Sequence, residues 1–398
     1  MLNREYSTYS KHRALCAVFC YTYVHMQLPY HAVRFLCLSL LAFTSLSYTF
    51  ASTTTPVTLS NMVDQLFIIG FHESAATATS SIGTLLTSSN IGGVLLAEQD
   101  NSTIIRPIQN PSQLKQIVID LQTLARTPLF ISVDEEGGAV RALKRKHGFR
   151  EILRSAFSYN TLPSQTLYND SLATAVYLQS FGVNLNFAPV VDLRINPTNP
   201  IIGAWGRSYS RHATRTNILA NAFIRGHANA NVVTSLKHFP GHGSSKKDSH
   251  VDVADITKSY TKAEMQPFTS IAGKNRVPMV MMGHLINTKI DSTYPASLSS
   301  THIRMLRSTG FTGVIITDDL DMSAIQKKWS RKEASVQALR AGNDMIIISF
   351  YNDTSIAEYA SIRNAVLDAV RAGIISEKDI AVKYERVQTL KKKYSIIP

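Results

Sequence analysis

The chain has 398 residues, of which 44% are hydrophobic, so the composition excludes a largely disordered protein and allows one large α/β domain or two ordinary ones. Lys and Arg number 41 against 28 Asp and Glu, a formal net charge of +13. This surplus favours a polyanionic partner such as nucleic acid or a bacterial wall polymer, or else is a basic surface without a specific partner.

The N-terminal segment, residues 1–51, predicts a secretory leader. Arg34 precedes an apolar run at 35–50, and small residues around Ala51 offer a site for signal peptidase. Met26 would give a leader of more ordinary length. The run is short for a membrane span of about 20 residues, so we expect cleavage near Ala51 and export to the periplasm or the medium. An uncleaved membrane anchor is the alternative. An exported chain would meet wall polymer, and no nucleic-acid partner is expected.

All three cysteines, Cys16, Cys20 and Cys37, lie in this leader. The mature chain, residues 52–398, would therefore contain no disulfide and no thiolate metal ligand. It would also lack a cysteine near Ala51 for lipid attachment, so no stable membrane anchor is expected.

Eight short apolar runs rich in Val, Ile and Leu predict strands that are buried on both faces, as in a parallel sheet. They are LFIIG at 66, IGGVLL at 91, PLFISVD at 128, VNLNFAPVVD at 183, VVTSLKH at 232, PMVMMGH at 278, GVIITDD at 313 and DMIIIS at 344. Helical periodicity lies between them at 111–126, 167–181, 212–230, 262–272 and 331–341. This α/β pattern predicts a single (β/α)8 TIM-type barrel. The alternative, a doubly wound sheet, lacks a glycine-rich dinucleotide motif after the first strand.

Reactive side chains end five consecutive strands, as expected if an active site lies at the carboxyl ends of barrel strands. These side chains are Asp134, Glu135, Glu136, Asp192, Lys237, His238, His284, Asp318 and Asp319. Strands also stop where polarity begins, so any single one of them could be coincidental. Their succession predicts a polar active site.

The segment at 235–250, SLKHFPGHGSSKKDSH, admits a metal, an anion or an acid/base interpretation. A zinc site would use His238, His242, His250 and Asp248, but the proline and glycines of PGHG oppose the helix that sets paired histidines on one face. The glycines do not match a phosphate-binding loop either. In an extended segment Asp248 and His250 would point the same way, so that the carboxylate could orient a histidine that titrates near neutral pH.

KHFPGHG, followed four residues later by DSH, resembles the bacterial β-N-acetylglucosaminidases of glycoside hydrolase family 3. The resemblance continues in the same order through VDQLFIIGF, IGGVLL, VDEEGG, NFAPVVDL, GRSYS, MMGHLINTKID, ITDDLDMSAI and ALRAGNDMI. It implies a one-domain barrel over residues 52–398 that releases terminal β-linked N-acetylglucosamine, commonly from peptidoglycan fragments. It also implies a retaining mechanism without a metal or other cofactor.

By this resemblance the nucleophile is Asp318, the first aspartate after the seventh strand, although the residues alone do not choose between Asp318 and Asp319. The acid/base is His250 assisted by Asp248, in place of the second carboxylate of most glycosidases. Four further residues match positions that hold sugar hydroxyls: Asp134, Arg207, Lys237 and His238. The glycines and polar residues at 241–250 also predict a mobile lid that carries the acid/base onto the glycosidic oxygen.

Two segments depart from the family pattern. The family follows EGG with Arg-Val-x-Arg, whereas EGGAVRAL places Ala139 and Ala142 at those positions, with Arg141 one position away. IIGAWGRSYS is longer than usual before Arg207. The leader is a third departure, because many relatives act in the cytoplasm.

Two other functions fit the same sequence. A β-glucosidase of the same family would share Asp318 but normally lacks the KHFPGHG and DSH loop. A non-catalytic protein that binds cell-wall glycan would keep the fold and the basic charge, and the altered EGGAVRAL segment is its best support.

Overall fold

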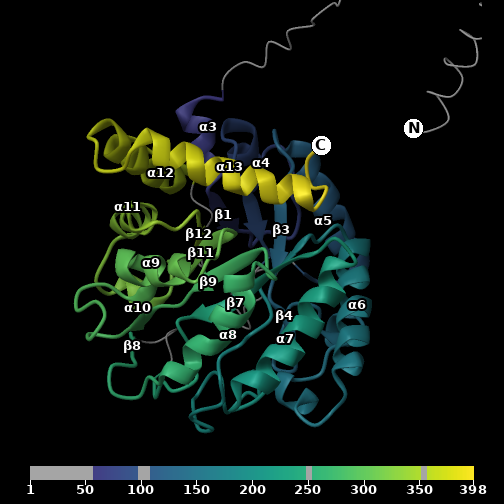
Figure 1. Ribbon diagram of the computed structural model, residues 1–398. Coiled ribbons are helices and arrows are strands. Elements are labelled where there is room, and N and C mark those ends of the chain that lie inside the picture. The colour runs from purple at the N-terminus through teal and green to yellow at the C-terminus, as the bar shows by residue number, and fades with distance from the viewer. Residues whose placement is uncertain (1–56, 97–107, 248–252, 351–355) are drawn as a thin grey trace, which may run out of the picture. The chain divides into compact units, whose positions relative to one another are not determined.

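A computed structural model describes residues 57–96, 108–247, 253–350 and 356–398 (Figure 1). The predicted leader, Asp248 and His250 lie outside the described residues. The predicted barrel is confirmed, because eight parallel strands close on themselves in chain order. They are β1 (Phe67–Gly70), β2 (Gly93–Leu95), β3 (Phe130–Val133), β6 (Leu185–Asn186), β7 (Val233–Phe239), β9 (Met279–Met282), β11 (Val314–Asp319) and β12 (Met345–Ile348).

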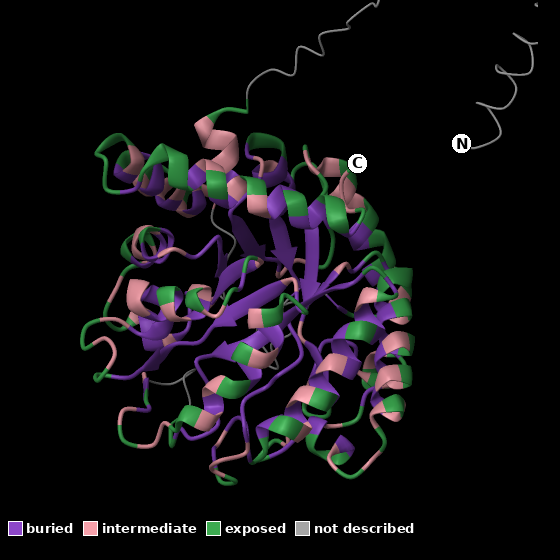
Figure 2. Ribbon diagram, viewed as in Figure 1, coloured by how far each residue is buried: buried purple, intermediate pink, exposed green. Residues whose placement is uncertain are grey.

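Each barrel strand coincides with one of the eight apolar runs, and only β7 extends past its run, by Phe239. The strands are almost entirely buried, as Figure 2 shows in purple, because helices cover the outside and side chains fill the inside. Close packing between two neighbouring barrel strands requires a glycine at position 70. A methyl group added to Gly70 would lie 2.1 Å from the carbonyl oxygen of Ser349, which follows the neighbouring β12.

The surrounding helices include the five that periodicity predicts. They are α4 (Ser81–Ser88), α5 (Pro111–Leu124), α6 (Ser164–Ser180), α7 (Ala213–Ala228), α8 (Gln266–Ile271), α9 (Ser300–Ser308), α10 (Ser323–Gln326), α11 (Arg331–Ala341) and α12 (Ile356–Arg371). The stretch at 262–272 begins as a 3₁₀ turn, η3 (Lys262–Met265), because Pro267 lacks the amide hydrogen that a continuous helix would need. In the described ranges no helix is both long and apolar enough to cross a membrane.

The end of the barrel at which the strands begin is covered by α3 (Leu59–Asp64) and α13 (Glu377–Lys393), which pack against each other. Lys391 of α13 is fully buried there. Its ammonium donates hydrogen bonds to Gln65 Oε1 at 2.9 Å and to the carbonyl of Pro128 at 2.8 Å. Burial lowers the pKa of Lys391 to about 7.

Two small sheets extend the other end of the barrel. β4 (Glu135–Gly137) and β5 (Val140–Arg141) form an antiparallel hairpin directly after β3, and β8 (Ala254–Asp255) pairs with β10 (Leu285–Ile286). The hairpin turns at Gly137 and Gly138, whose φ angles are 89° and 64°. Other residues would adopt these positive φ angles only with strain. The turn at these two glycines therefore fixes the positions of Glu135 and Glu136, which precede it.

Candidate active site

Lys237, at the carboxyl end of β7, contacts two carboxylates that follow β3, the predicted site residue Asp134 and Glu136. Its ammonium lies 2.6 Å from Asp134 Oδ1 and 2.7 Å from Glu136 Oε1. Burial alone would lower the pKa of Lys237, but the two carboxylates outweigh it and raise that pKa. Lys237 is therefore a buried ammonium at neutral pH.

Arg207 completes this cluster through a fork of two hydrogen bonds to Glu136, at 2.8 Å from Nε and 2.7 Å from Nη2. Burial would raise the pKa of Glu136, but Arg207 and Lys237 lower it to about 2. The pKa of Arg207 is raised, since Glu136 above all outweighs the effect of burial. Glu136 is thus the shared anion of two buried cations.

Asp192, in the loop between β6 and α7, holds two histidines of the KHFPGHG segment. Its Oδ2 accepts from His238 Nδ1 at 2.7 Å, and its Oδ1 accepts from the backbone N–H of His242 at 2.7 Å. Burial would raise the pKa of Asp192, but His238 and His242 lower it. Because Nδ1 of His238 is the donor, Nε2 is the ring atom left to meet a ligand, and no described residue bonds it.

The segment at 241–245 is anchored, which corrects the prediction that a mobile lid begins at residue 241. All five residues are buried. Asn199 Nδ2 donates to the carbonyls of His242 and Ser245, and the backbone N–H of Asn196 donates to the carbonyl of Gly243 at 3.0 Å. These donors come from the loop after β6, so any mobile part must begin beyond Ser245.

A buried carboxylate, Glu264, anchors the same segment from the other side. Its Oε1 accepts from the backbone N–H of Ser244 at 3.0 Å, and its Oε2 accepts from the N–H of Thr261 at 3.1 Å, closing the capping box of η3. Burial raises the pKa of Glu264 to about 7, against the smaller effect of these hydrogen bonds.

The two aspartates at the end of β11 have different surroundings. Asp319 is buried, and its Oδ1 accepts from the backbone N–H groups of Asp321 and Ser349, both at 3.0 Å. Its carbonyl accepts from His284 Nε2 at 2.7 Å. Asp318 is half-buried, and its Oδ1 accepts from the N–H of Asp319 at 2.9 Å. The geometry favours Asp318 as the reactive carboxylate and gives Asp319 a role in fixing the loop.

The departures in EGGAVRAL have a clear structural outcome. Arg141 is buried inside the hairpin, where Nη2 donates to the carbonyl of Leu153 at 2.5 Å and Nη1 lies 3.4 Å from Glu135 Oε1. Ala139 is exposed and Ala142 is buried. Arg141 is thus engaged in the hairpin and does not replace an arginine at 142.

The four predicted sugar-binding residues are brought together. Glu136 and Asp192, which hold them, were predicted only as strand-end carboxylates and were given no role, and Glu264, which anchors the segment at Ser244, was not predicted. Glu136 and Asp192 lie at strand ends where the sequence already showed a carboxylate, so the position was a usable signal. Glu264 lies in a helical stretch without such a signal. In the part of the chain that the structure describes, no group of three His, Asp or Glu side chains could hold a metal ion.

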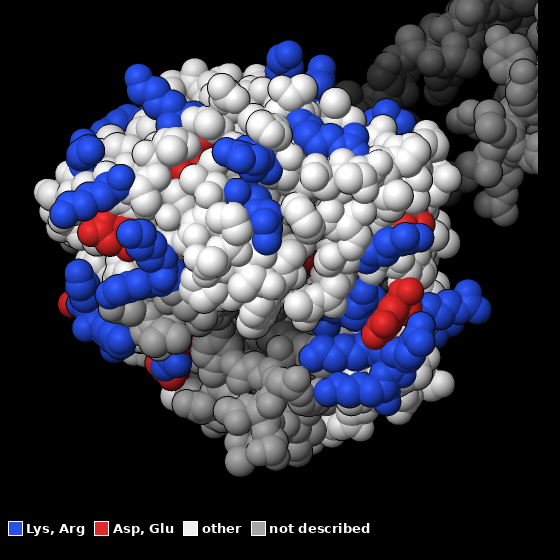
Figure 3. Space-filling view, turned by 90° about the horizontal axis from the view of Figure 1, so that it is seen from below, with Lys and Arg blue, Asp and Glu red and all other residues white. Residues whose placement is uncertain are grey.

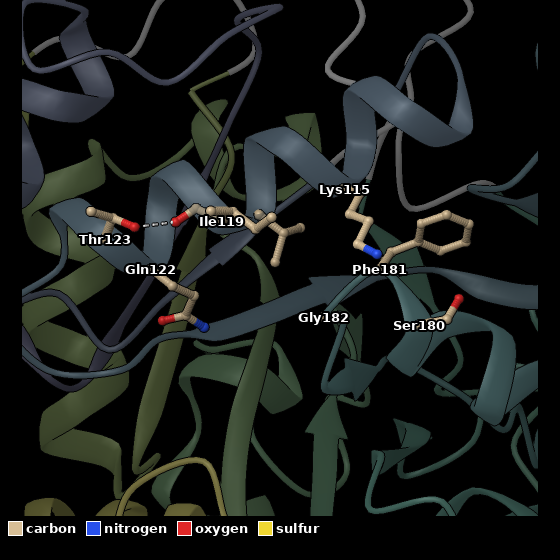
Figure 4. A pocket seen from close by; sticks show the side chains of 8 residues that line it. Lys115, Ile119, Gln122, Thr123, Ser180, Phe181 and Gly182 are labelled. Carbon is tan, nitrogen blue, oxygen red and sulfur yellow. Dashed lines mark hydrogen bonds between the residues drawn. The ribbon is translucent and has the colours of Figure 1, made fainter.

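The outer surface carries two further features. Lys and Arg side chains predominate over Asp and Glu on the face seen from below in Figure 3, as the net charge leads one to expect. A groove between α5 and the turn after α6 is shown in Figure 4 and is lined by residues that include Lys115, Ile119 and Phe181. It contains none of the predicted site residues.

Comparison with known proteins gives consistent matches. Residues 58–390 match the Glycosyl hydrolase family 3 N terminal domain. Beta-hexosaminidase A of Pseudoalteromonas piscicida is 28% identical over 85% of this chain and 62% of its own length. Beta-hexosaminidase of Shewanella frigidimarina is 34% identical over 65% of this chain and 74% of its own.

Solved structures give the same result. A glycoside hydrolase family 3 β-N-acetylglucosaminidase from Paenibacillus sp. superposes with a TM-score of 0.76 and 31% identity, over 85% of this chain and 63% of that one. A β-N-acetylhexosaminidase from Beutenbergia cavernae gives a TM-score of 0.73 and 29% identity, over 84% and 98% of the two chains. The chain thus spans less than two thirds of the Pseudoalteromonas and Paenibacillus proteins.

Glu136→Gln should destabilise the fold strongly, because it takes from the buried Arg207 its carboxylate partner among the described residues and leaves the buried Lys237 with Asp134 alone. We expect a loss of about 3 to 5 kcal/mol in the free energy of unfolding, measured by urea denaturation. Glu151→Gln is the control, since Glu151 pairs with the exposed Arg145 and should cost less than about 1 kcal/mol. Equal losses in both variants would contradict the role given to Glu136.

Proposed function

Because this chain belongs to glycosyl hydrolase family 3, we propose that it is a retaining hydrolase that releases terminal β-linked N-acetylglucosamine. The names of the two curated relatives and of the two structures above support a hexosaminidase over other members of the family. The observation that carries the proposal is Asp318, a half-buried carboxylate near the carboxyl end of β11, which is the end of the barrel that also carries the sugar-binding candidates.

In the proposed reaction an oxygen of Asp318 attacks the anomeric carbon while the bond to the leaving oxygen breaks. The leaving oxygen takes a proton from His250, and a glycosyl ester remains on Asp318. Water then gives its proton to His250 and attacks the same carbon, which releases the sugar and regenerates the carboxylate. Asp248 would orient His250. Both residues lie outside the described ranges, so their roles rest on the family pattern.

The charged cluster suits the ground-state task of holding the sugar ring. Asp134 can accept from hydroxyl groups, whereas Lys237 and Arg207 are donors whose positions are fixed by Glu136. His238 offers Nε2 while Asp192 holds its other nitrogen. These groups would orient the ring without having to reorganise during the reaction.

We further propose that the substrates are peptidoglycan or its fragments and that the protein acts outside the cytoplasm. The leader-like sequence of residues 1–51 and the basic surplus of the chain support both statements. A β-glucosidase is the alternative enzyme, and a non-catalytic protein that binds wall glycan is the alternative from another class. Hydrolysis of aryl N-acetylglucosaminides, compared with aryl glucosides, separates all three.

Asp318→Ala should abolish turnover and leave the fold intact, because it removes the covalent step and no packing contact. A mechanism-based fluorosugar should label Asp318 in the wild-type chain, as located by mass spectrometry of its peptides. Circular dichroism of the variant is the control for folding. A label on Asp319 or Asp134 would overturn the assignment.

His250→Ala should slow hydrolysis by roughly 10²- to 10⁴-fold for substrates whose leaving group needs protonation. Acidic phenols leave without that proton, so glycosylation with them should slow much less, and Asp248→Asn should give a milder version of this pattern. Single-turnover kinetics with a series of phenols measures the difference. Equal losses across the series would show that His250 is not the acid.

Export predicts a mature protein whose N-terminus lies near Ser52. Fractionation of the producing cells followed by N-terminal sequencing would measure both its compartment and its first residue. A full-length product found in the cytoplasm would refute the proposal of export while leaving the proposed activity untouched.

A further inference from the structure

Two glutamates close capping boxes in the same way but differ in their surroundings. Glu333 is the third residue of α11, and its carboxylate accepts from the backbone N–H of Ser330 at 2.8 Å. Glu264 is the third residue of η3 and accepts from the N–H of Thr261 at 3.1 Å. Glu333 is exposed, as most glutamates are, whereas Glu264 is fully buried. A capping box therefore does not explain the burial of Glu264.

This burial places a carboxylate in the fold without a cation to offset its charge. Among the described residues, no lysine or arginine forms an ion pair with Glu264. Burial above all, and the nearby carboxylate of Asp192 to a smaller extent, raise the pKa of Glu264 to about 7. The same capping hydrogen bonds lower the pKa of the exposed Glu333. Glu264 thus changes its charge near neutral pH, where Glu333 stays ionised.

Three segments contribute titratable groups to the surroundings of Glu264, and these groups are Asp192, His238, His242, Tyr260 and Lys262. Burial lowers the pKa of His242 to about 4 and raises the pKa of Tyr260, so both are neutral at pH 7. Lys262 is exposed. His238 shares Asp192 with the backbone of His242, so its titration has to be separated from that of Glu264 by replacement of each residue.

A short path of hydrogen bonds leads from Glu264 to the ring of His238. Glu264 Oε1 accepts from the backbone N–H of Ser244 at 3.0 Å. Two residues earlier, the N–H of His242 donates to Asp192 Oδ1 at 2.7 Å, and Asp192 Oδ2 accepts from His238 Nδ1, also at 2.7 Å. The position of the turn that Glu264 holds is therefore linked to the orientation of the ring of His238.

The charge of Glu264 decides how firmly it holds this turn. As a carboxylate it accepts from two backbone N–H groups, those of Ser244 and Thr261, one at each oxygen. A protonated carboxyl carries a hydrogen on one oxygen, so one of these two hydrogen bonds is weakened. The side chain has little room to adjust, because a methyl group added to Gly241 would lie 2.6 Å from the Cβ of Glu264.

We propose that Glu264 is a positioning residue: its carboxylate holds the turn at 241–245 so that Asp192 presents His238 to a sugar hydroxyl, and protonation loosens that turn. The inference rests on the proposed function and deepens it, because it adds a residue that controls sugar binding without touching the sugar. Glu264 takes no part in the bond-breaking step. Since its charged form is the competent one, kcat/KM should fall as the pH falls through about 7.

The test compares Glu264→Gln with the matched control Glu333→Gln on an aryl N-acetylglucosaminide. Glutamine has the shape of the protonated carboxyl and does not titrate, so Glu264→Gln should lower kcat/KM at about pH 8 by roughly 5- to 10-fold, as expected for one misaligned hydrogen bond. The loss should lie mainly in KM, because the ring is held before the reaction. The fall near pH 7 should be absent from this variant, whereas Glu333→Gln should keep the wild-type pH profile.

A double-mutant cycle tests whether Glu264 acts through His238. In the His238→Ala background, Glu264→Gln should have no further effect on kcat/KM. Glu264→Asp keeps a titrating carboxyl and should keep a fall in kcat/KM on the acid side, which a loss of packing alone would not restore. Circular dichroism at each pH controls for folding.

The outcomes separate the inference from the proposed function. If the wild type hydrolyses no N-acetylglucosaminide, the proposed function fails. If it does, a fall in kcat/KM near pH 7 that persists in Glu264→Gln overturns the inference, as does an undiminished effect of this change in the His238→Ala background. If Glu264→Gln does not fold, the wild-type chain still decides, since a flat profile between about pH 6 and 8 overturns the inference.

Discussion

Two buried cations, Lys237 and Arg207, constrain the whole carboxyl end of the barrel, because a buried charge is stable only beside an opposite one. Glu136 meets both of them. That contact requires a fixed arrangement of three segments: the hairpin after β3, the end of β7 and the loop before α7. The turn at Gly137 and Gly138 sets the backbone position of Glu136, which directly precedes it. The arrangement of sugar-binding candidates is thus a consequence of charge neutralisation.

Asp192 imposes a similar constraint on backbone groups. Its carboxylate accepts hydrogen bonds from the ring of His238 and from the backbone N–H of His242. The position of the KHFPGHG segment therefore depends on the position of the loop after β6. The asymmetry between Asp318 and Asp319 has the same origin. A carboxylate that accepts from two backbone donors serves to shape a loop, whereas its half-buried neighbour is the one that we propose as the nucleophile.

The barrel could be predicted because a strand buried on both faces leaves a local signal, as GVIITDD and DMIIIS illustrate. The pairing of one charged side chain with another leaves no such local signal in the sequence. Glu136 and Arg207 are 71 residues apart, and no periodicity links them. The prediction of a lid from residue 241 was wrong in its first part for this reason, since the anchors of that segment are Asn196 and Asn199 from another loop. The side-chain amide of Asn199 and the backbone N–H of Asn196 donate to backbone carbonyls of the segment. Every residue has a backbone carbonyl, so the sequence does not indicate these hydrogen bonds.

Gly243 gives this anchoring a mechanical meaning. A methyl group there would lie 1.7 Å from the carbonyl oxygen of Leu193, so the two backbones touch without an intervening side chain. The segment at 241–245 is therefore held against the loop after β6 by direct backbone contact as well as by hydrogen bonds, so that a side chain at residue 243 would push the two apart.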